Sequence, residues 1–245
     1  MSSVHKIIIS CIVGLCFVGG SLALGLSFYK AKAPVRTVSV VGSATKDFNS
    51  DLIIQRFTIT VEDQNIKDGY AKMKKAREAV EKYLKENGVD LKDVSFKNVS
   101  SYKDEDYIYD RAKDYGYYQF RCYKFSQEVR IESNAVKKIE ALNLSYLTSD
   151  EVKVDVYDPS YYYTKLSDLK IEMLANATKD AKERAETIVK NAGGKLGGLK
   201  VSSMGVFQIT SPNSSDEDYE WGGAFNTSSY KKSASITMRL TYYVK

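Results

Sequence analysis

A run of 23 residues without a charge or a proline, Ile7 to Tyr29, most constrains what this chain can fold into. At 1.5 Å per residue a helix of this length covers roughly 34 Å, which exceeds the about 30 Å hydrocarbon core of a bilayer. A long helix buried in a soluble protein normally keeps one polar face, and this run has none. The run therefore predicts a membrane-spanning helix, with Phe28 and Tyr29 at the interface.

A cleavable signal peptide is the alternative interpretation of this run. Ser21-Leu22-Ala23 offers small residues at the two positions that a signal peptidase reads. The apolar run continues past Ala23 to the length typical of membrane helices, which favours an uncleaved signal anchor. We expect residues 1–36 to form this anchor with its basic flank, and residues 37–245 to form the folded domain.

The charges around the run do not settle its orientation. Lys6 precedes the run, whereas Lys30, Lys32 and Arg36 follow it, which by the positive-inside rule would keep the domain in the cytoplasm. Long domains translocate largely regardless of such a bias. The side of the membrane is therefore assigned from the family resemblance described below.

Most of the excess of basic over acidic residues lies near the apolar run. Of the 36 Lys and Arg residues, four flank the run, and the 32 that remain face 31 Asp and Glu. A nucleic-acid-binding domain is expected to carry a basic excess clustered on one face, and this domain has no strongly basic stretch. We therefore expect no nucleic-acid partner.

Histidine and cysteine are nearly absent from the domain. His5 is the only histidine of the chain, and Cys122 is the only cysteine outside the apolar run. These counts exclude an internal disulfide, a Ser-His or Cys-His nucleophilic pair, and zinc bound by histidine or thiolate ligands. Cys122 lies in a strand-like stretch, which favours a half-buried structural residue over a reactive thiol.

Acidic runs are the remaining candidates for chemistry. Asp104–Tyr107 and Asp216–Glu220 contain carboxylates that a cation could use, but such runs are usually solvated loop charge. We therefore name no catalytic residue, no cofactor-binding residue and no metal ligand, and we expect no cofactor.

Residues 52–157 predict one α+β lobe. An apolar period of two indicates strands, and a period of three or four indicates helices. The expected elements are strands at 52–63, 94–102, 119–132 and 151–157, and helices at 65–88 and 133–147. The buried face of the first strand is expected to hold Ile53, Gln55, Phe57, Ile59 and Val61, and that of the first helix Ile66, Tyr70, Met73, Arg77, Val80 and Leu84. This is the split βαβ order of ferredoxin-like sandwiches, in which two helices cover one face of an antiparallel sheet.

Residues 37–51 and 158–245 predict a second lobe with a long helix. Ala177, Ala181 and Ala185 fall four apart in a helix expected at about 162–192, and this face is expected to pack against a sheet. Strands are expected at 37–41, 199–210 and 233–244, and the first of these is expected to join the second sheet.

The stretch NAGGKLGGLK, Asn191–Lys200, has the glycines and lysines of a phosphate-binding loop. Phosphate loops lead from a strand into a helix N-terminus, where free N–H groups and the helix dipole attract an anion. Here the glycines follow a helix C-terminus, so an anion would be repelled. We expect Gly193 or Gly194 to end the helix in a left-handed conformation, and Gly197-Gly198 to form the turn into the next strand.

Four segments in order resemble the SIMPL-domain family. They are Val38–Leu52, Tyr83–Phe96, Asp180–Gly205 with its A-x-x-R-A helix and glycine turn, and Ala234–Val244. The resemblance implies a two-lobed α+β domain in an exported, envelope-associated bacterial protein. It also implies oligomers, since relatives form them, and a link to oxidative stress in some relatives. It provides no catalytic residue to transfer.

Two segments depart from the family pattern. Asn49-Ser50-Asp51 stands where the family has a small residue, a proline and an aspartate, and the tyrosine-rich insertion Lys103–Tyr118 is less typical. These departures concern loops and leave the expected fold unchanged.

Two functions of different classes follow. The first is a non-enzymatic, single-pass cell-membrane protein whose extracytoplasmic domain, in the periplasm or at the outer face, self-associates or binds an envelope protein. The second is a small-ligand or glycan binder, or a hydrolase, that uses an acidic aromatic cleft made by Lys103–Asp110 and Ser214–Asn226. Loops are expected at 103–118 and 211–230, and the second contains Trp221, the only tryptophan.

Overall fold

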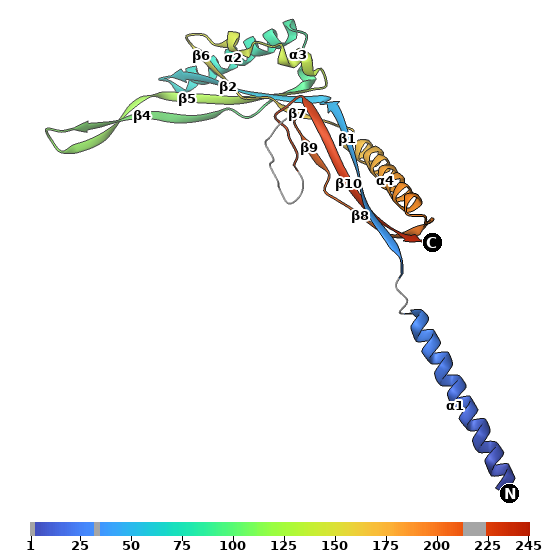
Figure 1. The fold of residues 1–245 in the computed structure, drawn as a ribbon. Helices are drawn as coiled ribbons and strands as arrows, with labels where there is room; N and C mark the ends of the chain where they lie inside the picture. The colour runs from blue at the N-terminus through green and yellow to red at the C-terminus, as the bar shows by residue number, and fades with distance from the viewer. Residues whose placement is uncertain (1–2, 32–34, 213–223) are drawn as a thin grey trace. The chain divides into compact units, whose positions relative to one another are not determined.

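The computed structural model describes residues 3–31, 35–212 and 224–245 (Figure 1). The helices are α1 (Ser3–Ala31), α2 (Ile66–Glu86), α3 (Val136–Glu140) and α4 (Leu166–Asn191), and short 3-10 turns span Leu91–Asp93 and Leu144–Leu147. The strands are β1 (Thr37–Asn49), β2 (Leu52–Asp63), β3 (Val94–Phe96), β4 (Ser100–Asp110), β5 (Tyr115–Ser133), β6 (Val152–Val156), β7 (Ser160–Tyr162), β8 (Leu196–Met204), β9 (Gln208–Thr210) and β10 (Lys231–Val244). Helices combined with antiparallel sheets confirm the α+β class.

The chain divides into two compact units. One unit comprises residues 1–42, 178–203 and 238–245, and the other comprises residues 43–177 and 204–237. Strands β1 and β10 and helix α4 contribute to both units, so the division falls inside elements and not in linkers.

The larger unit contains a six-stranded sheet. Its order is β3-β5-β2-β6, with β4 paired to β5 and β7 paired to β2, and the pairs are antiparallel. This order is the one that a split βαβ arrangement produces, because β5 inserts between the two strands of the first strand-helix-strand unit, β2 and β3, and β6 pairs with the other edge of β2. The strand order predicted for a ferredoxin-like lobe is therefore confirmed.

Helices α2 and α3 cover one face of this sheet (Figure 1). The predicted face of β2 is buried at all five positions, Ile53, Gln55, Phe57, Ile59 and Val61. The one polar member, Gln55, donates from Nε2 to the main-chain carbonyls of Arg56 and Tyr157 at 3.1 and 2.6 Å. Its polar group is thus satisfied inside the core, as burial requires.

Helix α2 buries a narrower stripe than predicted. Its buried residues are Gly69, Met73, Ala76, Val80 and Leu84. Ile66, Tyr70 and Arg77, which were expected on the same face, are exposed. The helix approaches the sheet at Gly69, where an added Cβ would overlap the ring of Phe125. A small residue at this contact, instead of a larger apolar one, explains the difference.

Helix α1 contains the apolar run. Among the described residues, it is the one helix long and apolar enough to cross a membrane, over Ile12–Tyr29. A membrane anchor and a signal sequence share this property.

The second sheet has the order β1-β10-β8, and β9 pairs antiparallel with β10. In the smaller unit, Ala181 and Ala185 of α4 pack with Val40 of β1 and with Leu240 and Tyr242 of β10. Every fourth residue of α4 is buried, namely Leu169, Met173, Ala177, Ala181, Ala185 and Val189. These contacts confirm that the alanine face packs on a sheet and that the first strand joins that sheet.

Asp51 connects several segments of the larger unit. Its carboxylate accepts hydrogen bonds from the main-chain N–H and the hydroxyl of Thr164, at 2.7 and 2.8 Å. Its own N–H donates to the carbonyl of Tyr162, and its carbonyl accepts from the side-chain amide of Asn134. Asn49-Ser50-Asp51 thus departs from the family pattern but keeps its aspartate, and Asp51 has a structural role.

The glycine stretch after α4 is partly as predicted. Gly193 has φ 77°, which confirms the left-handed helix stop. Gly197 and Gly198 lie inside β8, so the predicted turn there is wrong. A Cβ at Gly197 would lie 2.8 Å from the main-chain oxygen of Tyr243, so glycine allows the close strand contact.

Other boundaries differ from the predictions. β1 continues through Gly42 to Asn49, and the strand expected at 199–210 is divided at Gly205 into β8 and β9. The helix expected at 133–147 shortens to α3 and a 3-10 turn, and its N-cap is Ala135.

The loop predicted at 103–118 is wrong. β4 and β5 pair through this segment as a hairpin, from Ser100 opposite Ser126 to Asp110 opposite Tyr115. The strand predicted at 94–102 is correspondingly divided between β3 and β4.

Candidate functional site

The β4–β5 hairpin extends past the six-stranded sheet (Figure 1). β2 pairs with β5 only as far as Tyr123, so residues 105–120 form a two-stranded ribbon. No other described strand pairs with either outer edge of this hairpin ribbon. Two-stranded ribbons are only marginally stable alone in water, and open edges can pair with another chain.

Aromatic side chains cover the hairpin ribbon. Tyr107, Tyr109, Tyr115, Tyr117, Tyr118 and Phe120 are each between 41 and 70% exposed. Soluble proteins rarely expose large contiguous apolar surfaces unless these bind something. Tyrosine is enriched in protein interfaces, because its ring buries a large area while its hydroxyl keeps a hydrogen bond. The ribbon therefore has the composition of a protein-docking surface.

The antiparallel register places aromatic rings on both faces of the ribbon. One face carries Tyr107, Tyr109, Tyr118 and Phe120, and the other carries Ile108, Tyr115 and Tyr117. The rings of Tyr107 and Tyr118 pack with their centroids 5.2 Å apart. Gly116 is required beside them, because a Cβ there would overlap the hydroxyl of Tyr107.

Local polar contacts hold the turn of the hairpin. Asp110 Oδ1 accepts the N–H of Ala112 at 3.0 Å. The hydroxyl of Tyr109 donates to the carboxylate of Asp114, and this hydrogen bond raises the pKa of Tyr109. Asp114 itself has φ 50°, in the left-handed region where aspartate is tolerated better than most side chains.

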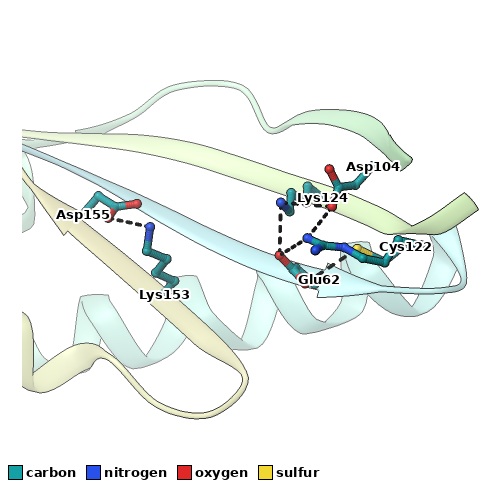
Figure 2. A network of polar contacts seen from close by, with 7 residues as sticks. Glu62, Asp104, Cys122, Lys124, Lys153 and Asp155 are labelled. Carbon is teal, nitrogen blue, oxygen red and sulfur yellow. Dashed lines mark hydrogen bonds and ion pairs between the residues drawn. The ribbon is translucent and has the colours of Figure 1, made fainter. Parts of the chain in front are cut away.

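Four charged side chains form a network at the root of the ribbon, which Figure 2 shows in close view. They are Glu62 of β2, Asp104 of β4, and Arg121 and Lys124 of β5. Lys124 Nζ lies 3.1 Å from Asp104 Oδ2 and 3.5 Å from Glu62 Oε1, and Arg121 also contacts both carboxylates. The hydrogen bond from Lys124 lowers the pKa of Asp104. This root network ties three strands together where the ribbon leaves the sheet.

Cys122 lies beside the root network (Figure 2). It is 6% exposed, and its Sγ is 3.6 Å from Glu62 Oε2. Burial, with a further contribution from the Glu62 charge, raises the pKa of the thiol. Because the thiolate is the reactive form, Cys122 is a poor nucleophile, in line with the expected structural role.

Of the two segments expected to form an acidic aromatic cleft, most of the second lies outside the described residues. Lys103–Asp110 belongs to β4, where its acidic residues lie in the ribbon and at its root. Of Ser214–Asn226 only residues 224–226 are described, with Phe225 bridged to Ile209; Trp221 lies outside the described residues. Within the described ranges, no three His, Cys, Asp or Glu side chains gather as a metal site would require.

A comparison with family models gives a match over residues 38–241, and the matching model is described as SIMPL, protein of unknown function (DUF541). The chain belongs to the SIMPL family. A search of curated proteins finds no match. The hairpin ribbon and its root network both lie within the matched range, so they are part of the SIMPL domain of this chain.

Proposed function

We propose that this SIMPL protein is a non-enzymatic, membrane-anchored envelope protein that binds protein chains through the hairpin ribbon, first of all further copies of itself. Helix α1 is its single-pass anchor, and its domain is extracytoplasmic. In this role the ribbon is a binding surface. Any part that the protein plays in envelope or oxidative stress depends on the protein that binds to this surface.

The single observation that carries this proposal is the exposed ribbon, residues 105–120, with aromatic rings on both faces and open edges. A second ribbon is a well-matched partner, because tyrosines pack on tyrosines and one open strand edge can pair with another. Each 100 Å² of apolar surface buried in such a contact contributes roughly 2.5 kcal/mol before the cost of association.

The membrane helix supports the same function. Copies anchored by α1 in one membrane meet at a raised effective concentration, so a contact that is weak in solution becomes effective. Long extracytoplasmic domains can be exported despite basic residues on their own side of the span, such as Lys30 and Arg36.

Size-exclusion chromatography with light scattering on the full chain in detergent tests the proposal. We expect the wild type to exceed the monomer mass, and a Tyr107→Ser, Tyr118→Ser double variant to shift toward the monomer. Tyr146→Ser is the matched control, because Tyr146 is 79% exposed but lies in a 3-10 turn away from the ribbon. A wild type that stays monomeric at high concentration, or a double variant of unchanged mass, contradicts self-association through the ribbon.

A further inference from the structure

The helix-free face of the six-stranded sheet has a hollow that the ribbon does not use. Its volume is about 550 Å³, and it is lined by Arg56, Lys97, Glu128, Arg130, Tyr157 and Asp158. Arg56 and Arg130 alternate along β2 and β5 with the buried residues that face the helices, so they point to the opposite side of the sheet. This polar hollow is therefore separate from the core.

Two arginines oppose each other in this hollow. Arg56 and Arg130 are direct partners in the β2–β5 register. Side chains at such positions start about 4.5–5.5 Å apart, and like charges placed there destabilise the sheet. An anion bound by both guanidinium groups would replace this repulsion with attraction.

The neighbouring carboxylates leave part of this pair unsatisfied. The carboxylate of Glu132 accepts a hydrogen bond from a terminal nitrogen of Arg130 at 2.6 Å, and the carboxylate of Glu128 forms an ion pair with Lys97 at 2.7 Å. The Nε of Arg130 is buried without a hydrogen-bond partner. The guanidinium of Arg56 has no ion pair with any described residue. A buried donor group of a cation destabilises the fold when it has no acceptor. An acceptor from outside the chain, bound in the hollow, would remove this cost.

We propose that this hollow binds a ligand through a carboxylate group. The planar fork of an arginine matches the two oxygens of a carboxylate. The lining contains three cations and two carboxylates, and Glu132 pairs with Arg130 from beside it, so the site has no excess charge and suits a singly charged carboxylate better than a doubly charged phosphate. Tyr157, whose hydroxyl hydrogen-bonds with Thr58 at 3.2 Å, provides an aromatic wall for the rest of the ligand. A free small acid and an acidic peptide side chain share this chemistry.

Nitrogen-proton NMR of the arginine Nε–Hε groups tests the proposal on the full chain in detergent. Acetate and a capped glutamate dipeptide are titrated at constant ionic strength, with chloride and phosphate as comparison anions. We expect a saturable shift of the Arg130 Nε–Hε signal with acetate or with the dipeptide. Arg56→Gln should weaken this binding by about tenfold or more, because a charge-assisted hydrogen bond is lost. Arg239→Gln, which removes an exposed arginine of β10, should leave it unchanged.

Thermal unfolding separates binding from a merely structural role of Arg56. Without ligand, Arg56→Gln should keep or raise the unfolding midpoint, because it removes the repulsion with Arg130. Acetate should raise the midpoint of the wild type and not that of the variant. Tighter binding of the dipeptide than of acetate identifies a peptide ligand, and equal binding identifies a small acid. The absence of a saturable shift with either carboxylate, an equal shift in Arg56→Gln, or the same response to chloride or phosphate overturns the proposal.

Discussion

At the scale of single residues, Lys232 is an unusual feature of the fold. It is 1% exposed, and its ammonium donates to the main-chain carbonyl and, at 3.4 Å, to the side-chain oxygen of Asn226. No carboxylate of the described residues forms an ion pair with it. Burial lowers the pKa of Lys232 from 10.5 to about 8. The folded state therefore bears a cost whenever this ammonium is charged.

We predict that Lys232 makes the stability of the fold increase with pH above about 8. Below that pH the folded and the unfolded chain are both protonated, and the full cost of burying the charge is present. Above that pH, Lys232 loses its proton in the folded chain but keeps it in the unfolded chain. The free energy of unfolding therefore rises by about 2 kcal/mol by pH 9.5. Urea unfolding of the full chain between pH 7 and 9.5 measures this rise. Lys232→Met removes this rise, so the stability of the wild type relative to that of the variant should increase over the range, and a constant difference between the two contradicts the prediction.

Asp51 is the second residue with a specific structural role. Asp51→Ala leaves the N–H and the hydroxyl of Thr164 without their acceptors, and should lower the free energy of unfolding by about 1–3 kcal/mol. Asp51→Asn keeps one acceptor oxygen, so it should lower the free energy of unfolding by about half as much as Asp51→Ala does. Urea unfolding at neutral pH measures both variants. An Asp51→Ala protein as stable as the wild type would show that these hydrogen bonds contribute nothing net.

At the scale of elements, the root network should hold the ribbon in its paired conformation. Asp104→Asn removes the charge that Lys124 and Arg121 contact, so amides of residues 105–120 should exchange hydrogen several-fold faster at neutral pH. Asp155→Asn, which breaks the 2.9 Å pair with Lys153 on β6, is the matched control and should leave this exchange unchanged (Figure 2). Mass spectrometry of the exchanged peptides measures both effects.

The pH dependence of this exchange follows from the lowered pKa of Asp104. The ionised carboxylate contributes fully above its ordinary pKa of 3.8, and its contribution is lost as pH falls through the lowered value. The ratio of exchange rates between Asp104→Asn and the wild type should therefore approach one in strong acid. A ratio that is one at all pH values would show that the network does not hold the ribbon.

The elements that could be predicted from sequence are those with two different faces. β2 and α2 bury one face and expose the other, so the period of their apolar residues locates them. The ribbon has consecutive large side chains at Tyr107, Ile108 and Tyr109, which removes the alternation of a half-buried strand. Its turn uses Asp114 in the left-handed region where a glycine would have been a recognisable signal. The sequence pattern therefore indicates a loop where the structure has a hairpin.

The candidate sites could not be predicted because they depend on strand register. Glu62 lies opposite Lys124, and Arg56 lies opposite Arg130, across strands that are far apart along the chain. A shift of one residue would place each of these side chains on the other face of the sheet, and sequence periodicity alone does not specify the partner residue. The tyrosine content of residues 103–118 was the one visible signal of the docking surface.

At the scale of the whole molecule, the membrane topology is directly measurable. Protease added to intact cells, after removal of any outer layer, should digest the domain, and the same treatment should leave a cytoplasmic marker protein intact. The mass of the mature protein should include residues 1–23, as an uncleaved anchor requires. A protected domain contradicts the extracytoplasmic placement, and a chain that begins after Ala23 contradicts the anchor.

We propose that the hairpin ribbon contacts other copies of this protein in the membrane. The most direct measurement places a photo-crosslinking amino acid at Tyr118, which is 70% exposed, in full-length protein co-expressed with two different tags. We predict a cross-linked species of twice the chain mass that carries both tags, and no such species when the same probe replaces Tyr146. Cross-links from Tyr146 as strong as those from Tyr118, or none from Tyr118, would contradict self-association through the ribbon.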